Sequence, residues 1–521
     1  MAASTSSTTP QTWKPIQKKT FIVAAFAIVV GLFSLETAPY ILTEISEQLD
    51  FSIENANIIR IAPYAASLLA VFIAGTLGDI FGSKKVLLGG AMIYCVGTVI
   101  ALSAQSFAVI LTGRALEGIG TMLLRVVSLA MVTAAFPSPA QQAIAFSGFA
   151  AVSPATQIFG PSIAAALAGL AGWRPVVGAW LLLGVLFMMT TAKLLPRDPG
   201  KNQKPEFTTP ILAGLALILL LSAITAFQTS SRQGLALLAI AVIALGLLSA
   251  IIKRLKSPAF DWTLPSQPGA IFILLALAAA NATDPIFFTT LFLQKQHNLL
   301  VAATSFALIP LNVGTTLGNL IAGPIIARIG AYRTILTGFL ISAAIALSFL
   351  FIKTDTPIAV IIAMTSSFLL FKMIGSPAML TMVMGLVPAR LAGMASSWRN
   401  ASQILGVAIG GVVVGSIIFN TFQSSLTELI DNSPLPRAQA EHIAGLIRQG
   451  NRELIPLDLA SMPAPALNDL IQPDGPAVNM AEIIAYRALG PAMAVSNVVA
   501  CLALWVSKQT QTAALRRAAE S

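Results

Sequence analysis

The sequence contains few charged residues, few cysteines and few histidines, and these shortages restrict what the protein can be. Of its 521 residues only 10% are charged, whereas 56% are hydrophobic. Soluble globular proteins carry about 25% charged residues, so this composition excludes an ordinary water-soluble globule. The two cysteines, Cys95 and Cys501, lie inside apolar runs without CxxC spacing, which favours packing roles over a disulfide or a metal site. His297 and His442 lie outside the apolar runs and no P-loop is found, so neither an enzyme nor an ATP-driven pump is predicted.

Long apolar runs predict membrane-spanning helices. Runs of about 20 residues recur along the chain, and each is long enough to cross a hydrocarbon core of ~30 Å as a helix. A membrane β-barrel would need short segments in which apolar and polar residues alternate. Segments 21–30 and 211–221 are instead continuously apolar. The predicted fold class is therefore all-α integral membrane.

Fourteen spans are expected, with two of them inserted between two groups of six. Their approximate ranges are 21–41, 56–81, 85–105, 107–134, 142–171, 174–195, 209–228, 234–252, 268–293, 300–328, 332–352, 356–388, 395–420 and 486–507. The expected domains are a tail (1–20), a six-helix bundle (21–195), a cytoplasmic linker (196–208), two inserted helices (209–252), a second six-helix bundle (268–507) with a long outer loop (421–480), and a tail (508–521).

The distribution of basic residues predicts the orientation of the chain. The formal net charge is +10, but the basic residues are scattered at helix ends and form no patch with aromatics, so nucleic acid is not expected as a partner. If the amino terminus is cytoplasmic, most Lys and Arg residues fall in cytoplasmic tails and loops. Those on the outer side are Arg232, Lys295, Lys353, Arg437, Arg448 and Arg452. The positive-inside rule then places both termini in the cytoplasm.

An internal repeat connects the two halves. Gly75-Thr-Leu-Gly-Asp79-Ile-Phe-Gly82-Ser-Lys84-Lys85 is echoed by Gly323-Pro-Ile-Ile-Ala-Arg328-Ile-Gly330-Ala-Tyr-Arg333, and each copy lies at a cytoplasmic helix end. Duplicated halves are typical of secondary transporters, in which the substrate site lies between the halves near the midplane. The first copy resembles the signature loop of the major facilitator superfamily, G-x-L-x-D-R-x-G-R-K, although Ile80 and Ser83 replace its arginines.

This resemblance implies the major facilitator fold, with two six-helix bundles that give access to each side of the membrane in turn. It also implies a conformational gate formed by Gly75, Asp79, Gly82, Lys84, Lys85, Gly323, Arg328 and Gly330. The alternative is a tight cytoplasmic turn whose lysines reach the membrane surface.

A second resemblance lies in the fourth span. Arg114-Ala-Leu-Glu117-Gly118 is similar to the family's R-x-x-Q-G motif, with glutamate in place of glutamine. Residues three apart meet on one face of a helix, so Arg114 and Glu117 are expected to pair. The pair could exchange a proton as water access alternates, or it could be a static tie between helices, and the sequence leaves both open. Arg125 is expected to extend toward the cytoplasm.

Two further motifs favour export. Gly160-Pro161-Ser-Ile-Ala-Ala, in the fifth span, resembles the family's antiporter motif G-P-x-x-G-G, which goes with exporters more than importers. An ordinary kinked helix is the alternative. Glu36, in Leu-Glu-Thr-Ala-Pro of the first span, stands where the fourteen-helix drug:proton antiporters carry an aspartate in L-D-x-T. The resemblance implies that Glu36 binds protons or substrate, whereas a carboxylate facing water at the outer end of the span is the alternative.

The second half contains three more charged candidates. Asp284 precedes Pro285 in the ninth span, where carbonyls freed by the proline could also bind a cation, and a helix cap is the alternative. Lys372 and Arg399 place positive charge within spans, where they could bind an anionic substrate or hold counter-charges. Arg399 is predicted as a ligand in the second half.

The predicted function is secondary active transport. A membrane-embedded carboxylate can be neutralised by a proton or by a cationic substrate, and competition between the two gives antiport. We therefore expect a proton-coupled antiporter in the plasma (inner) membrane that exports small lipophilic cationic or neutral drugs. No cofactor is expected, because the proton gradient supplies the energy. The alternative is a specific exporter or importer of an anionic metabolite that Arg114, Lys372 and Arg399 recognise.

The expected partners are a small-molecule substrate, protons and the lipid bilayer. A periplasmic adaptor and an outer-membrane channel could dock on the 421–480 loop if the cell has two membranes. The substrate, the proton stoichiometry and the oligomeric state are not written in the sequence.

Overall fold

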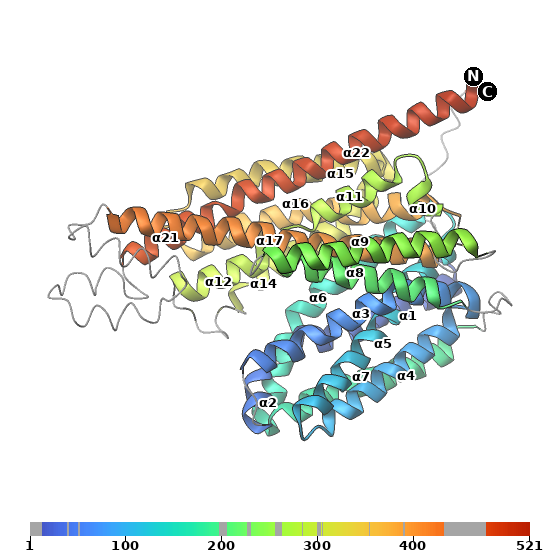
Figure 1. The fold of residues 1–521 in the computed structure, drawn as a ribbon, viewed down its shortest axis with the longest axis horizontal. Coiled ribbons are helices and arrows are strands. Elements are labelled where there is room, and N and C mark those ends of the chain that lie inside the picture. Colours follow the sequence, from blue (N-terminus) through green and yellow to red (C-terminus); the bar gives the residue numbers. More distant parts are fainter. Residues whose placement is uncertain are drawn as a thin grey trace. The chain divides into compact units, whose positions relative to one another are not determined.

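The computed structural model is helical throughout the part of the chain that it describes, without a strand there (Figure 1). The described residues are 13–38, 41–49, 53–196, 206–226, 231–255, 263–283, 285–297, 299, 304, 306–353, 355–388, 391–431 and 476–520. Among them, ten helices are long and apolar enough to cross a membrane. Shorter apolar helical segments also occur at 62–78, 208–224, 270–280 and 413–422. The all-helical class is confirmed, and the count of fourteen spans stays a prediction.

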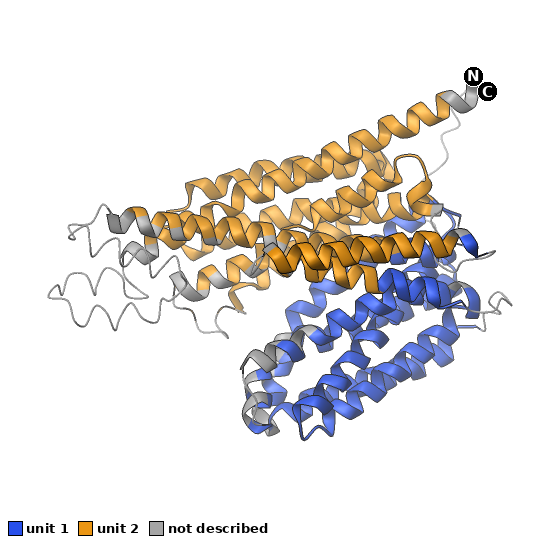
Figure 2. Cartoon of the chain, in the orientation of Figure 1, with its two compact units in different colours: residues 1–214, 254–261, 387–397 blue, residues 215–253, 262–386, 398–521 orange. Residues whose placement is uncertain are grey.

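The helices group into two compact units, which Figure 2 shows in different colours. Unit 1 contains residues 1–214, 254–261 and 387–397, and unit 2 contains residues 215–253, 262–386 and 398–521. Helices α8 (Thr208–Ala226) and α17 (Ala392–Asp431) each contribute residues to both units, and Arg254, the last residue of α9 (Ser231–Arg254), belongs to unit 1. The domain boundaries drawn from the span pattern stay predictions.

Unit 1 is built around α5 (Phe107–Ala135), which packs against α1, α3, α4 and α6. Its other helices are α1 (Pro15–Thr37), α2 (Leu42–Gln48), α3 (Ile53–Phe81), α4 (Ser83–Leu102), α6 (Pro139–Ala171) and α7 (Trp173–Leu194). Helix α4 lies beside both α5 and α7 (Figure 1). Both α1 and α6 begin with proline, which suits a first helical turn because its missing N–H would have no helical partner there.

Unit 2 is built around α16 (Ile358–Gly385), which packs against α11, α12, α14 and α15. Its other elements are α9 (Ser231–Arg254), α10 (Thr263–Ser266), α11 (Ala270–Ala280), α12 (Pro285–Gln296), α14 (Ile309–Ile329), α15 (Ala331–Leu347), the 3₁₀ turn η2 (Ser348–Phe351), α21 (Pro476–Arg487) and α22 (Leu489–Glu520). Helix α22 packs against α11 and α15.

Three helix ends differ from the predicted ranges. The ninth span, 268–293, is two helices and not one, because α11 ends at Ala280 and α12 begins at Pro285. Helix α17 continues to Asp431, so it extends into the predicted 421–480 loop. Helix α1 begins at Pro15, within the predicted tail. The rest of the loop up to residue 475, and most of the linker (197–205), lie outside the described residues.

The two copies of the sequence repeat form the same backbone turn. Gly82 joins α3 to α4 with φ 83° and ψ 151°, and Gly330 joins α14 to α15 with φ 82° and ψ 157°. Only glycine adopts this region of φ and ψ readily, because a Cβ atom would clash with the backbone. The matched glycines of the repeat are therefore required by the geometry of a turn that occurs once in each unit.

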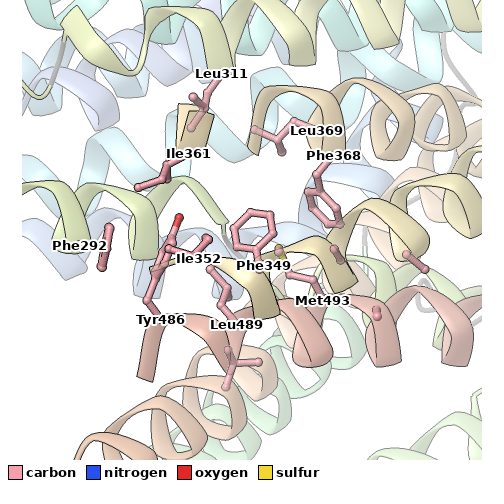
Figure 3. Close-up of a cluster of buried hydrophobic side chains, with 14 of the residues drawn as sticks. Phe292, Leu311, Phe349, Ile352, Ile361, Phe368, Leu369, Tyr486, Leu489 and Met493 are labelled. Carbon is pink, nitrogen blue, oxygen red and sulfur yellow. The ribbon is translucent and has the colours of Figure 1, made fainter. Parts of the chain in front are cut away.

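An apolar cluster forms the core of unit 2 at one end of α16 (Figure 3). Phe292 of α12 stacks on Tyr486 of α21 with ring centroids 4.1 Å apart, and both side chains are buried. The Tyr486 hydroxyl lies 2.8 Å from the Thr289 hydroxyl, which satisfies its polar atom within the cluster. These contacts connect α12 to α21.

Candidate transport site

Close packing of α4 against α5 places two charged residues of α5 deep in unit 1. A Cβ atom at Gly97 would lie 2.7 Å from the Gly113 carbonyl oxygen, and one at Gly113 would lie 2.7 Å from the Gly97 carbonyl oxygen. Neither position could hold a larger residue while the two helices keep this separation. Small residues at membrane helix contacts allow such close approach of backbones. Arg114 and Glu117 follow Gly113 directly and are held next to α4 and α7.

Arg114 and Glu117 form the predicted ion pair within α5. The Arg114 guanidinium donates to the Glu117 carboxylate, and the two residues are only 2% and 0% exposed. The guanidinium also lies 4.9 Å from the ring centroid of Trp180 on α7. The Trp180 indole N–H in turn donates to the Thr37 hydroxyl of α1 at 2.8 Å. The pair therefore stands in a buried polar network that joins α1, α5 and α7.

Glu36 lies in a different environment, half-buried near the end of α1. Its carboxylate accepts a hydrogen bond of 2.9 Å from the side-chain amide of Gln157 on α6. Arg125 of α5 lies within electrostatic range of Glu36 and of Tyr64 on α3. Glu36, Gln157 and Arg125 are half-buried and Tyr64 is 48% exposed, so this group is more accessible than the Arg114–Glu117 pair. We call these four residues the Glu36 cluster.

The sequence predicts that Arg125 extends toward the cytoplasm, and the structure places it within electrostatic range of Glu36. Gln157 gave no sequence signal beyond its place in a motif-bearing helix. The only clue to either residue was a polar side chain within an apolar run.

Lys84, one of the predicted gate residues, stabilises a helix end in unit 1. Lys84 donates to the carbonyl oxygens of Ala192 and Leu195, at 2.7 and 2.6 Å, and so caps the carboxyl end of α7. A cation at this position suits the negative end of the helix dipole. Lys85 is exposed. The side chain of Asp79 lies outside the described residues.

Gly75 lies where α3 packs against the first turns of α17. A Cβ atom there would lie 2.6 Å from the Gly393 carbonyl oxygen. The Ser397 hydroxyl donates to the Val71 carbonyl at 2.6 Å, and the Ser396 hydroxyl donates to the Val126 carbonyl at 3.0 Å. Two neighbouring serines of α17 thus bind the backbones of α3 and α5.

The remaining predicted gate and motif residues have fewer described contacts. In the second repeat Gly323 is buried, whereas Arg328 and Gly330 are exposed.

Gly160 is buried, and a Cβ atom there would lie 3.5 Å from the Thr37 methyl carbon of α1. Helix α6 continues through Pro161, whose side chain lies outside the described residues. The antiporter motif thus packs next to the turn of α1 that carries Glu36.

Unit 2 holds buried cationic and polar groups around the break between α11 and α12. Lys372 of α16 is 5% exposed, and its ammonium donates to the carbonyl oxygen of Thr283 at 3.2 Å. Arg399 of α17 is half-buried and donates to Asn400 at 3.4 Å. Asp284, the third candidate of the second half, lies outside the described residues. No group of three or more potential metal ligands occurs in the part of the chain that was described.

The surface and interior together define the class of protein. Large apolar side chains on α9 are exposed, among them Leu235 at 60% and Ile243 at 61%, and such a surface suits lipid. Ionisable residues inside membrane-spanning helices mark transport pathways in most cases where they occur. A helical bundle with an apolar surface, an ionisable interior and a duplicated turn is the architecture of a secondary transporter.

Comparison with known proteins identifies the family. The family model for the Major Facilitator Superfamily matches residues 22–411, and the chain belongs to this superfamily. It is 26% identical over 423 residues to the multidrug resistance protein Stp of Mycobacterium tuberculosis (strain CDC 1551 / Oshkosh), covering 74% of this chain and 76% of that protein. It is 24% identical over 416 residues to the tetracenomycin C resistance and export protein of Streptomyces glaucescens, covering 77% and 76% respectively.

Among solved structures, the proton:xylose symporter XylE, bound to 6-bromo-6-deoxy-D-glucose, has the same fold. The TM-score is 0.57 at 13% sequence identity, over 94% of this chain and 95% of that chain. The chain is thus a multi-pass membrane transporter, with multidrug and antibiotic resistance proteins among its relatives. Because a symporter has this fold too, the fold does not determine the direction of transport.

Proposed function

We propose that the protein is a proton-coupled antiporter that exports small lipophilic molecules, cationic or neutral, across the plasma membrane. Two relatives that it resembles over about three quarters of its length are named for drug resistance, and one of them for export. The observation that supports proton coupling is the Glu36 cluster. It contains a carboxylate within a membrane-spanning helix, a hydrogen-bond donor to it, and a cation from a third helix.

The Glu36 cluster supplies the chemistry of exchange. Ionised Glu36 is stabilised by the Gln157 amide and by the positive charge of Arg125. A proton that binds the carboxylate removes its charge and so weakens its attraction to Arg125. A cationic substrate competes with the proton for the same negative charge, because either one neutralises it. Binding of one therefore drives release of the other, which is the requirement for antiport.

The Arg114–Glu117 pair is assigned a structural part in this mechanism. Both residues are almost fully buried and belong to one helix, so their charges stay paired when the surrounding helices move. Their pairing within α5 instead connects that helix to Trp180 and, through it, to Thr37 beside Glu36. Of the two roles that the sequence left open for the pair, we propose the static tie.

Three further features belong to the same proposal. Both termini are cytoplasmic, fourteen helices span the membrane, and the proton gradient is the energy source without a cofactor. If the cell has two membranes, a periplasmic adaptor and an outer-membrane channel would dock on the 421–480 loop. The buried Lys372 and half-buried Arg399 favour, as a second candidate, transport of an anionic metabolite.

The deciding experiment uses purified full-length protein in liposomes of phosphatidylethanolamine and phosphatidylglycerol with an imposed pH gradient. Ethidium, tetraphenylphosphonium, a neutral polyketide and the organic anion fluorescein are added in turn, and proton movement is followed with a lumenal pH dye. We expect protons to cross the membrane when ethidium, tetraphenylphosphonium or the neutral polyketide is added, and not when fluorescein is added.

Two variants with the same chemical change test the role of Glu36. Glu36→Gln is expected to abolish substrate-driven proton flux, whereas Glu44→Gln, at a half-buried residue of α2, is expected to retain it. Proton flux that responds only to fluorescein would replace the proposal with the anionic candidate. Proton flux that survives in Glu36→Gln would remove Glu36 from the mechanism.

A further inference from the structure

The break between α11 and α12 lies near the middle of a membrane-spanning segment. Helix α11 contains 11 residues, which at a rise of 1.5 Å per residue extend about 17 Å, or roughly half of a ~30 Å hydrocarbon core. Thr283 follows α11 and precedes α12, so its carbonyl group lies between the two helices. Irregular backbone at this depth needs partners from the protein, because lipid supplies none.

Lys372 provides that partner. It stands midway along the 28-residue helix α16, and its ammonium donates to the carbonyl oxygen of Thr283 at 3.2 Å and to the Thr283 hydroxyl at 3.4 Å. The ammonium also lies 5.5 Å from the ring centroid of Phe368, one turn earlier in α16. A carbonyl oxygen, a hydroxyl oxygen and an aromatic face are all groups that attract a cation.

Three other contacts hold the break in position. Gln403 of α17 donates to the Asn281 side chain at 3.5 Å. The hydroxyls of Thr283 and Ser496, on α22, lie 3.5 Å apart. A Cβ atom at Gly410 of α17 would collide with the Ala282 backbone, so α17 is packed directly against the break. The acceptor site for Lys372 is therefore fixed by helices other than α16.

We propose that Lys372 is a second proton-binding site of the transport cycle, with the carbonyl and hydroxyl of Thr283 at the helix break as its acceptor site. This rests on the proposed function, since it adds a second proton to the same antiport cycle. In the charged state the ammonium holds the break closed. When an N–H bond of the ammonium breaks, the proton passes to water, the electron pair stays on nitrogen, and the neutral amine holds Thr283 more weakly. Release of the proton thereby frees α12 to move relative to α16.

A buried ammonium is suited to this exchange. A charge within the membrane is costly to keep, and loss of the proton removes that cost. Arginine could not take this part, because a guanidinium keeps its proton in proteins. The choice of lysine at position 372 is thus an essential part of the proposal.

Other titratable groups on the helices packed against α16 lie at helix ends. Helix α11 carries none. The others are Lys295 near the end of α12, Arg328 in the last turn of α14, and Tyr332 and Arg333 in the first turn of α15. Helix α17, which packs against the break, carries the half-buried Arg399. Asp284 follows Thr283 in the sequence and is the rival proton carrier.

The test measures the number of protons exchanged per ethidium molecule in liposomes whose membrane potential is clamped with potassium and valinomycin. The ethidium gradient that stops net flux is determined at several pH gradients, and the slope gives the stoichiometry. We expect Lys372→Arg, which cannot lose its charge and so holds the break closed, to exchange ethidium about tenfold or more slowly than the wild-type protein and to move one proton fewer in the exchange that remains. Lys353→Arg, an exposed lysine with the same substitution, is the matched control and should keep the wild-type stoichiometry.

The outcomes separate this proposal from the proposed function. If Glu36→Gln loses coupling while Lys372→Arg keeps the wild-type stoichiometry, the antiport proposal stands and the Lys372 proposal is overturned. The Lys372 proposal is also overturned if Asp284→Asn moves one proton fewer per ethidium molecule while Lys372→Arg moves the wild-type number. Asp284 would then be the second proton-binding site. If the wild-type protein moves no protons with any compound, both proposals fall.

A second pair of variants applies if Lys372→Arg does not fold. Thr283→Val removes the hydroxyl acceptor and keeps the carbonyl, and Thr283→Ser keeps both. We expect the pH midpoint of ethidium exchange to move to lower pH in Thr283→Val, because the ammonium loses one acceptor, and to stay in place in Thr283→Ser. Equal midpoints in the two variants would contradict the assignment of Thr283.

Discussion

Two arginines on one face of α5 illustrate how the position of the counter-charge decides the role of a membrane-embedded residue. Arg114 is paired with a carboxylate of its own helix, so the pair stays neutral in any arrangement of the helices. Arg125 lies near Glu36, which belongs to α1. Their interaction depends on how α1 and α5 are placed, and it can therefore change during a transport cycle. We expect stability to depend on the first arginine and coupling on the second.

Replacement of one member of the buried pair should destabilise the protein. Glu117→Met leaves the Arg114 guanidinium buried without its carboxylate, and such losses cost about 3–5 kcal/mol. Thermal unfolding in detergent should show a clearly lower midpoint. The double variant Arg114→Met/Glu117→Met removes both charges, so its midpoint should recover most of that loss and its proton flux should be retained. A stable double variant without proton flux would show that the pair exchanges protons after all.

Loss of the donor to Glu36 should slow transport without unfolding the protein. Gln157→Met keeps the size of the side chain and removes the amide, and a hydrogen bond to a charged group contributes about 1.5–3 kcal/mol. We expect substrate-driven proton flux to fall about tenfold or more at neutral pH. Gln142→Met, on the same helix but bonded to the Thr133 carbonyl, serves as the control and should lower the flux much less. Equal effects of the two substitutions would argue against a role for Gln157.

At the residue scale, the sequence predicts contacts within a helix and misses those between helices. The Arg114–Glu117 contact follows from a spacing of three residues, and the structure confirms it. The Gln157–Glu36 contact depends on how α1 and α6 are rotated about their axes. An apolar run gives the depth of a residue but not its rotation, because lipid-facing and buried positions of a membrane helix are both apolar.

At the scale of elements, the repeated turn gives a test of backbone strain alone. A Cβ atom at Gly330 meets nothing within 4 Å, but the φ of 82° is unfavourable for any other residue. Gly330→Ala should therefore destabilise unit 2 by about 1–3 kcal/mol, visible as a lower unfolding midpoint.

Gly385 is the matched control for this change. It also has open space around it, but it ends α16 without a positive φ. Gly385→Ala is expected to leave the midpoint unchanged or to raise it slightly, because alanine favours helix. A midpoint in Gly330→Ala as high as in Gly385→Ala would mean that the turn can adopt another conformation.

Helices bounded by short turns were predicted well, and interrupted ones were not. Helix α5 occupies 107–135, against a predicted span of 107–134, because Ser and Pro residues flank a continuous apolar run. The break between α11 and α12 was not predicted as two helices, although Pro285 was recognised as a helix breaker. The break is short, and the apolar residues of α11 and α12 on its two sides together have the length of a single span. The same property hides the break from a prediction based on apolar length.

At the scale of the whole molecule, the orientation of the chain can be tested with single cysteines. After Cys95 and Cys501 are replaced by serine, Ser103→Cys, Ala140→Cys, Phe207→Cys and Leu255→Cys are introduced one at a time. Ser103 and Ala140 flank α5, and Phe207 and Leu255 flank the α8–α9 pair.

A membrane-impermeant maleimide should label only Ser103→Cys in intact cells, and the other three only after permeabilisation. This follows from one span between the first two positions and two spans between the last two. Labelling of Phe207→Cys and Leu255→Cys from opposite sides would show that α8 and α9 do not both cross the membrane, and the count of fourteen would be wrong.

The pairing of Arg114 with Glu117 also bears on how the chain is synthesised. Each charge alone would cost about 2.5–3.5 kcal/mol when α5 enters the bilayer from the translocon. Because the two residues belong to one helix, they can neutralise each other as soon as that helix forms, before any later span has emerged from the ribosome. The first bundle can thus be inserted helix by helix, without waiting for a partner to bring the opposite charge.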